Sequence, residues 1–415
     1  MISVRQETTE TPRKETRGGT SEDGTPEGGT PEGGTSEGGT PKGGTPEGEK
    51  PEGGTPKGRT SEGRTPEGEA RWVLESFTER NIKEMIDMKE LLRTGCELLA
   101  DNRDLIHKNF MWDMEMMSVV GSVVYTGAGK TANIEKMMNC KKILKKNEGI
   151  FSVFRSNMEI PILCKMALSE DPEAYLANLR MVYDKLTKGK IFGSEYMALT
   201  ALSICDVNMA DKIDDIVAVT KELMKRMSSA HPILTSDEDA PLVALLALSG
   251  KSVDEIMEET EYCFNTMKKK FSFHGNAVQS LSHVLTMCAG GAQEKCARVS
   301  AIYDALVVQG VNYGKDYELA SLGALVNVDM TPEELAKEIA EASDYLKNRK
   351  GFGNWSMGKQ GRAMFAALLA AQAFAPSSSA MDASVIGASL AMVIAEEIAL
   401  MVIVASTTAS ASSSN

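Results

Sequence analysis

Apolar positions between residues 150 and 350 recur as paired helical patterns with a period of about 40 residues. The clearest marker is a tetrapeptide whose fourth residue is Leu or Met. Its copies begin at positions 183, 224, 264, 303 and 343, so the intervals are 41, 40, 39 and 40 residues. In each unit a loop marked by Gly or Asp precedes a strongly apolar first helix, and a more charged, amphipathic second helix follows. One such pair cannot cover its own apolar helix, so neighbouring pairs must stack.

The sequence also marks where second helices begin. Asp171 puts a capping residue before a proline at the first helical position, and the segments that start at Ser252 and Thr331 have the capping-box pattern. Apolar residues within these helices step by three and four. The sequence therefore predicts an all-α fold of stacked helical-hairpin repeats, arranged either as an α-solenoid or as a closed α/α ring.

Composition sets the limits of this domain. Residues 1–70 hold 17 of the 36 glycines and 8 of the 14 prolines, and they repeat the unit Thr-Pro-Glu-Gly-Gly without any aromatic residue. Such a segment cannot form a packed core, so we expect a disordered tail that serves as a spacer or has no role. The expected domains are this tail, a helical-repeat domain at 71–375, and at 376–415 a Ser/Ala-rich linker, an apolar terminal helix and a disordered end.

Charge and cysteine content narrow the class of protein. The formal charge is −13, and residues 1–70 contribute −5 of it, so both parts of the chain are acidic and a nucleic-acid partner is disfavoured. The seven cysteines are scattered, odd in number and without a CxxC pair, unlike exported disulfide frameworks. The first residues contain no apolar stretch that could act as a signal peptide. We therefore expect a reduced, cytoplasmic protein.

The stretch Ala383–Ala405 is apolar on every face except at Glu396 and Glu397. Its ten Val, Ile and Leu residues contribute about −4.5 kcal/mol to membrane insertion, and two central carboxylates cost about 2.5 to 3.5 kcal/mol each. Because the sum is near zero or unfavourable, we expect a terminal helix buried against protein rather than a membrane anchor.

The sequence contains neither a complete phosphate-binding loop nor histidines at the spacing of a metal site. The segment Thr126–Thr131 is similar to the tail of a phosphate-binding loop, but Val124 stands where the first glycine is required. We interpret the segment as a turn between helices in which Thr131 caps the second one. The four histidines lack HxxxH or HExxH spacing, so we expect no metal site and no cofactor.

The first helix that begins near residue 275 is the most polar of its kind. Asn276, Gln279, Ser280 and His283 are spaced by three and four, so they lie along one face of that helix, close to His274. This stripe either faces a cavity, with His283 as a proton carrier to a polar ligand, or holds a structural imidazole bonded to backbone groups.

Charged residues also recur where first helices begin. In a curved array they converge on the inner rim, where they could grip a polar molecule or act as an acid and base pair. The alternative is that the acids cap helix N-termini, which leaves Arg155 and Arg362 unexplained. The candidate ligand-facing residues are Arg155, Glu195, Asp239, His274, Asn276, His283, Glu318 and Arg362.

Four stretches, in characteristic order and spacing, are Leu144–Arg155, Gly193–Tyr196, Gly275–Leu285 and Gly351–Gly353. In them the chain resembles an uncharacterised, mainly Firmicutes family, the domain-of-unknown-function family numbered four thousand and three. The likeness runs from about residue 75 to the Ala- and Ser-rich tail. It implies a bacterial, cytoplasmic protein and carries over no catalytic residue.

These observations favour a non-enzymatic binding or scaffolding protein whose loop-bearing face binds a peptide, a protein segment or a small polar ligand. The competing class is an enzyme built as a closed ring, with Arg155, Glu195, His283 and Glu318 directed into a polar central cavity. A weaker alternative is a peripheral membrane adaptor that docks through Ala383–Ala405.

Overall fold

The structure, a computed structural model, describes residues 66–110, 115–189, 193–206, 212–316 and 318–374. Over these residues it is helical and contains no strand, which confirms the all-α prediction. The odd-numbered helices are α1 Pro66–Asn109, α3 Ile134–Asn147, α5 Pro172–Thr187, α7 Ile213–Ala230, α9 Val253–Lys270, α11 Ala292–Val308 and α13 Pro332–Lys347. The even-numbered helices are α2 Glu115–Gly127, α4 Glu159–Leu168, α6 Glu195–Asp206, α8 Ala240–Ala247, α10 Gly275–Met287, α12 Leu319–Gly323 and α14 Gly358–Ala373.

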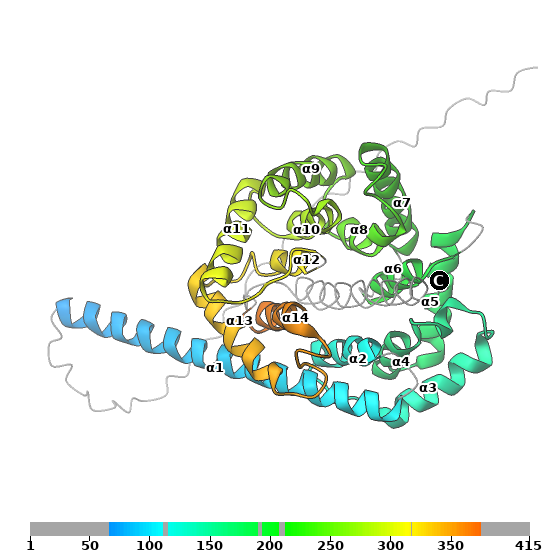
Figure 1. Cartoon of the computed structure of the whole chain (residues 1–415), viewed down its shortest axis with the longest axis horizontal. Coiled ribbons are helices and arrows are strands. Elements are labelled where there is room, and N and C mark those ends of the chain that lie inside the picture. The colour runs from blue at the N-terminus through cyan, green and yellow to red at the C-terminus, as the bar shows by residue number, and fades with distance from the viewer. Residues whose placement is uncertain (1–65, 111–114, 190–192, 207–211, 317, 375–415) are drawn as a thin grey trace, which may run out of the picture. The chain divides into compact units, whose positions relative to one another are not determined.

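Odd and even helices form two layers within the unit that begins at Thr65 (Figure 1). The even-numbered helices lie on the inner side and are covered all round, as in α6, where every residue from Met197 to Ile204 is buried. The odd-numbered helices lie outside them and bury one face only, as in α7. This difference follows from the sequence, because the first helices are apolar throughout and the second helices are amphipathic.

The recurring tetrapeptide marks the seam between the layers. Its fourth residues, at positions 186, 227, 267, 306 and 346, are all buried. Its aromatic first residues pack edge-on or tilted against a ring in the loop before the preceding inner helix: Tyr183 on Phe154 at 5.1 Å, Phe264 on His231 at 4.8 Å, and Tyr303 on Phe271 at 5.1 Å. In these three copies the aromatic residue packs the outer helix against the loop that begins its own hairpin.

Successive outer helices contact one another from α1 to α13, and so do the inner helices α2 and α4 and those from α6 to α14. The first described helix also contacts the last two. α1 packs against α13 and α14. Asp101 accepts a hydrogen bond from Arg349 at 2.7 Å, and the buried side chain of Arg103 lies against Gly351.

Most of the expected helix starts are present. Asp171 caps α5 ahead of Pro172, and Ser252 and Thr331 form capping boxes on α9 and α13. One expectation was wrong: Asn133, not Thr131, caps α3, because the amide side chain of Asn133 accepts the backbone N–H of Lys136.

The helical part of the structure begins before the expected domain boundary. α1 begins at Pro66, ahead of the expected boundary at residue 71. The Thr-Pro-Glu-Gly-Gly repeat up to residue 65, and the stretch Ala383–Ala405, lie outside the described residues. In the part of the chain that is described, no helix has both the length and the apolarity needed to cross a membrane.

Candidate functional site

Four buried polar side chains meet where α8 and α10 begin. Thr235 and Asp239 come from the loop before α8, and Gln279 and His283 lie one turn apart on α10; we call these four residues the α8–α10 cluster. The amide nitrogen of Gln279 donates to the Thr235 hydroxyl at 3.0 Å and to an Asp239 carboxylate oxygen at 3.2 Å. The other Asp239 oxygen accepts the backbone N–H of Ser236 at 2.9 Å.

Three polar atoms of this cluster have no hydrogen-bond partner among the described residues. They are Oε1 of Gln279 and both ring nitrogens of His283, a residue with 0% exposed surface. The Gln279 amide cannot be turned to satisfy its oxygen, since that would direct the oxygen at the Asp239 carboxylate. A buried polar atom without a partner costs about 1 to 3 kcal/mol, so this group calls for an occupant that forms hydrogen bonds.

Burial sets the protonation of the cluster. Desolvation lowers the pKa of His283 to about 4, with a smaller effect from the charge of His231, so the imidazole is neutral at pH 7. Desolvation raises the pKa of Asp239 to about 6, although the hydrogen bonds from Ser236 and Gln279 act to lower it. The 4.0 Å between His283 Nδ1 and Asp239 Oδ1 exceeds hydrogen-bonding distance, and with a neutral imidazole it is not an ion pair.

The other acids that the sequence singled out are engaged elsewhere. Glu195 accepts hydrogen bonds from the Ser156 hydroxyl at 2.5 Å and from Asn157 at 3.2 and 3.3 Å, so it ties the loop before α4 to the start of α6. Glu318 is buried at the start of α12 with its carboxyl group against Gly314, and desolvation raises its pKa. His274 bonds Asp316 at 2.8 Å through Nδ1, and Asn276 is exposed.

The two arginines have a structural explanation that the sequence did not reveal. Arg362 is buried and donates to the carbonyl of Phe352 at 3.0 Å and to the side chain of Asn354 at 3.1 Å. Arg155 donates to the carbonyl of Glu148 at 3.1 Å. Each guanidinium group bonds a backbone carbonyl in the connection before an inner helix, α4 for Arg155 and α14 for Arg362. The candidate residues therefore form separate local pairs, and only Asp239 and His283 share one cluster.

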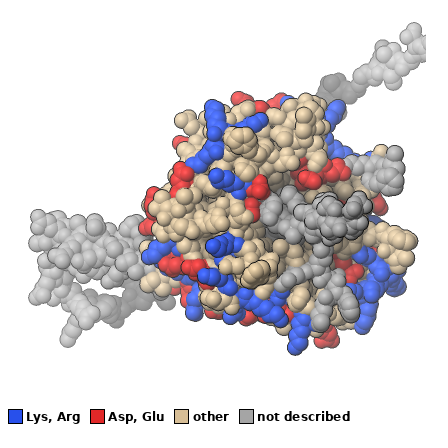
Figure 2. All heavy atoms as spheres, in the orientation of Figure 1, with Lys and Arg blue, Asp and Glu red and all other residues tan. Residues whose placement is uncertain are grey.

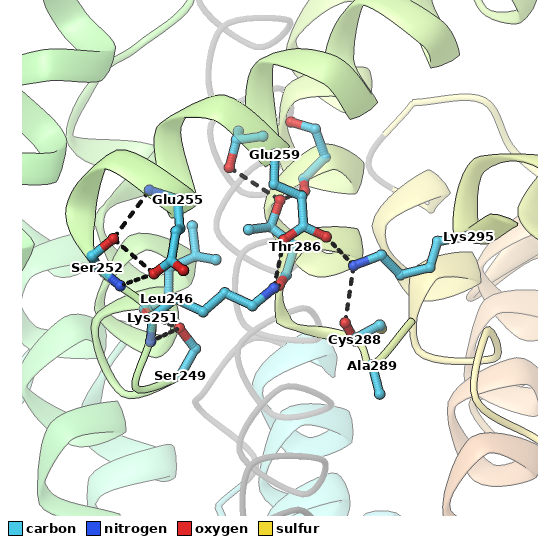
Figure 3. Close-up of polar contacts among 12 residues, drawn as sticks. Leu246, Ser249, Lys251, Ser252, Glu255, Glu259, Thr286, Cys288, Ala289 and Lys295 are labelled. Atoms are coloured by element: carbon cyan, nitrogen blue, oxygen red, sulfur yellow. Dashed lines mark hydrogen bonds and ion pairs between the residues drawn. The ribbon is translucent and has the colours of Figure 1, made fainter. Parts of the chain in front are cut away.

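A second, partly buried polar group, at the opposite end of α10, was not evident from the sequence (Figure 3). Glu259 on α9 lies between two ammonium groups: Lys251 contacts one carboxylate oxygen at 2.5 Å, and the buried Lys295 of α11 contacts the other. Lys251 also donates to the carbonyl of Thr286 at 2.6 Å, and Lys295 to that of Cys288 at 2.9 Å. These cations complement the C-terminal end of α10, and every charge has a partner, which marks this charged triad as structural.

In the described part of the chain, no three His, Cys, Asp or Glu side chains are grouped as metal ligands. Lys and Arg side chains are interspersed with Asp and Glu over the face in view (Figure 2). The segment Thr126–Thr131 is a turn between α2 and α3, held by Asn102, which donates to the Lys130 carbonyl and accepts the N–H of Ala132.

Comparison with known proteins places the chain among proteins without an assigned activity. The model of a family described as "Protein of unknown function (DUF4003)" matches residues 102–399. The "Uncharacterized protein YeaA" of Bacillus subtilis (strain 168) is 20% identical over 273 residues, which cover 64% of this chain and 80% of that protein. No solved structure matches the chain.

Proposed function

The chain belongs to this family of proteins of unknown function, and we propose that it is a helical-repeat protein that binds a small polar ligand at the α8–α10 cluster. The observation that carries the proposal is the set of three unpartnered polar atoms in a buried group of four side chains. Unpartnered buried atoms also occur elsewhere in the described chain, among them the hydroxyl oxygens of Ser118 and Tyr125, but His283 has both ring nitrogens without a partner and lies one turn from Gln279. A fully buried imidazole with neither nitrogen bonded is best explained by a missing partner.

The architecture we propose for this function is a closed ring of helical hairpins. Its support is the contact of α1 with α13 and α14, together with the alternation of inner and outer helices. The inner helices α8 and α10 contact each other and their neighbours α6 and α12, which keeps the cluster between them rigid.

The chemistry of the cluster defines the ligand class. Neutral His283 offers one donor and one acceptor, and Gln279 Oε1 offers an acceptor. The ionised Asp239 adds negative charge nearby, which disfavours an anionic ligand. We therefore propose a neutral or cationic ligand with hydroxyl or amide groups, which enters through the loop before α8, where Ser236 and Glu238 are exposed.

Native mass spectrometry of the full chain, purified without denaturants, tests this proposal. The wild-type protein should carry a small polar compound, and the variants Gln279→Leu and His283→Leu should lose it. Ser203→Ala is the matched control, because Ser203 is equally buried on α6 but bonds its own helix at the Leu199 carbonyl. A wild-type protein without any such compound, and without stabilisation by hydroxyl- or amide-bearing metabolites, would contradict the proposal.

We propose that the protein works in the cytoplasm. All seven cysteines are free thiols, and five of them are buried. A reducing compartment maintains this state.

A further inference from the structure

Large apolar side chains are exposed in one kind of loop. Four connections from an outer helix to the next inner helix are described throughout: α3–α4, α7–α8, α9–α10 and α13–α14. Each has one apolar residue that is almost fully exposed, and Val308 (86%) is exposed at the last residue of α11. The loop-tip residues are Phe151 (96%), Ile233 (94%), Phe273 (95%) and Trp355 (103%), and we count Val308 with them. No other large apolar side chain in the described part of the chain is as exposed. Exposed apolar residues are ordinary when scattered, but these recur in connections of one kind.

Side-chain bonds link three of these loops to the next inner helix or to the next loop. Glu195 bonds the loop that follows Phe151, and Gln279 bonds Thr235 in the loop that follows Ile233. His274, next to Phe273, bonds Asp316 in the following loop. The loop tips therefore belong to one row of adjacent loops and not to opposite ends of the hairpins.

Exposed lysines flank three of the tips, and another lies in the connection that follows Val308. They come from the last turn of the outer helix or from the loop itself, and none has an ion-pair partner among the described residues. These lysines are Lys145, Lys146, Lys268, Lys269, Lys315 and Lys350. The acids in the same row include Asp237 and Glu238 beside Ile233, Asp304 paired with Lys270, and Asp316 bonded to His274. Beside Phe151 lie Glu148, which is paired with Arg180, and the exposed Asp184. The row thus combines apolar tips with lysines that form no ion pair among the described residues, two of which, Lys268 and Lys315, lie over the rings of Phe264 and Tyr303.

We propose that this row docks on the surface of an anionic lipid bilayer. Each tip is a single side chain on its own connection. A bilayer accepts such tips one by one, because each enters the interface independently. Lysines one or two turns away extend their ammonium groups to the anionic headgroups while their stems cover apolar surface. This site is separate from the stretch Ala383–Ala405 considered from the sequence.

Vesicle sedimentation of the full chain tests the proposal. The probes are vesicles of phosphatidylcholine alone and of phosphatidylcholine with about one-third phosphatidylserine. The protein should bind the anionic vesicles at least about tenfold more tightly, and added salt should weaken binding. The triple variant Phe151→Ser, Phe273→Ser, Trp355→Ser should lose about tenfold or more in affinity. The quadruple variant Lys145→Gln, Lys146→Gln, Lys268→Gln, Lys269→Gln should lose the preference for anionic lipid.

The matched control is Ile86→Ser with Leu91→Ser, two exposed apolar residues on α1 outside the row. This control should bind as the wild type does, and all variants should keep the wild-type melting temperature because the replaced side chains are exposed. Binding that survives in the triple variant would overturn the proposal and assign binding to another part of the chain. Absence of binding, together with wild-type self-association that the triple variant abolishes, would identify a second copy as the partner instead.

Discussion

His283 is fully buried with both ring nitrogens unpartnered, so its replacement tests the cluster directly. We expect His283→Leu to be neutral or to stabilise the ligand-free protein by about 1 kcal/mol at pH 7.5, since it removes two unsatisfied polar atoms and keeps a side chain of similar size. Urea denaturation measures this free energy of unfolding. A loss above about 2 kcal/mol would show that the imidazole has hydrogen bonds in the native state.

The pH dependence of stability separates the two titrating groups of the cluster. The folded-state pKa of His283, about 4, lies below its ordinary value of 6.5, so the unfolded chain takes up a proton first and stability falls as pH drops from 6.5 to 4. The folded-state pKa of Asp239, about 6, lies above its ordinary 3.8, so here the folded protein takes up the proton first and stability rises over nearly the same range.

In the wild-type protein these opposite contributions nearly cancel between pH 6 and pH 4. As the pH falls from 6 to 4, the free energy of unfolding of Asp239→Asn should therefore decrease by about 3 kcal/mol relative to that of the wild type. That of His283→Leu should increase by about 3 kcal/mol relative to the wild type. Urea denaturation at several pH values measures both slopes. Parallel slopes for the two variants would refute the assignment of these protonation states.

At the scale of helices, the charged triad joins α9, α10 and α11. Glu259→Gln leaves the ammonium groups of Lys251 and Lys295 facing each other without a carboxylate. We expect a loss of about 3 kcal/mol in the free energy of unfolding, at the lower end for a buried pair because Lys251 is partly exposed. The adjacent Glu258, which is exposed, provides the control: Glu258→Gln should change stability by less than about 0.5 kcal/mol. Equal effects of the two variants would show that the triad contributes nothing.

The sequence predicted the elements better than the contacts between them. Capping signals at Asp171, Ser252 and Thr331 are local, so they were readable without tertiary information. The polar stripe on α10 was predicted as one face, but its partner Thr235 lies 44 positions earlier and carries no signal of its own. Arg155 and Arg362 bind backbone carbonyls, which no residue type identifies. Their role was therefore accessible only from the structure.

At the scale of the whole molecule, the contact between α1 and the last hairpin depends on Gly351. Its φ of +80° is strained for other residues, and an added Cβ would lie 2.3 Å from Nε of the buried Arg103. Gly250 has a similar φ of +75° but open space around it. Gly250→Ala should cost about 1 kcal/mol from backbone strain alone, and Gly351→Ala at least about 2 kcal/mol more. Thermal denaturation compares them, and equal costs would mean that Arg103 yields without penalty.

The bond between Asp101 and Arg349 spans 248 positions of the chain. The contacts of α1 with the last helices can therefore form only when almost the whole chain has been synthesised. A nascent chain can build its early hairpins while it emerges from the ribosome, but α1 has to wait for α13 and α14. During that interval the part of α1 that lies against α14, at Gly95 and Leu99, has no final cover. Synthesis that stops before residue 350 therefore yields an intermediate with exposed apolar surface, which chaperones and proteases recognise.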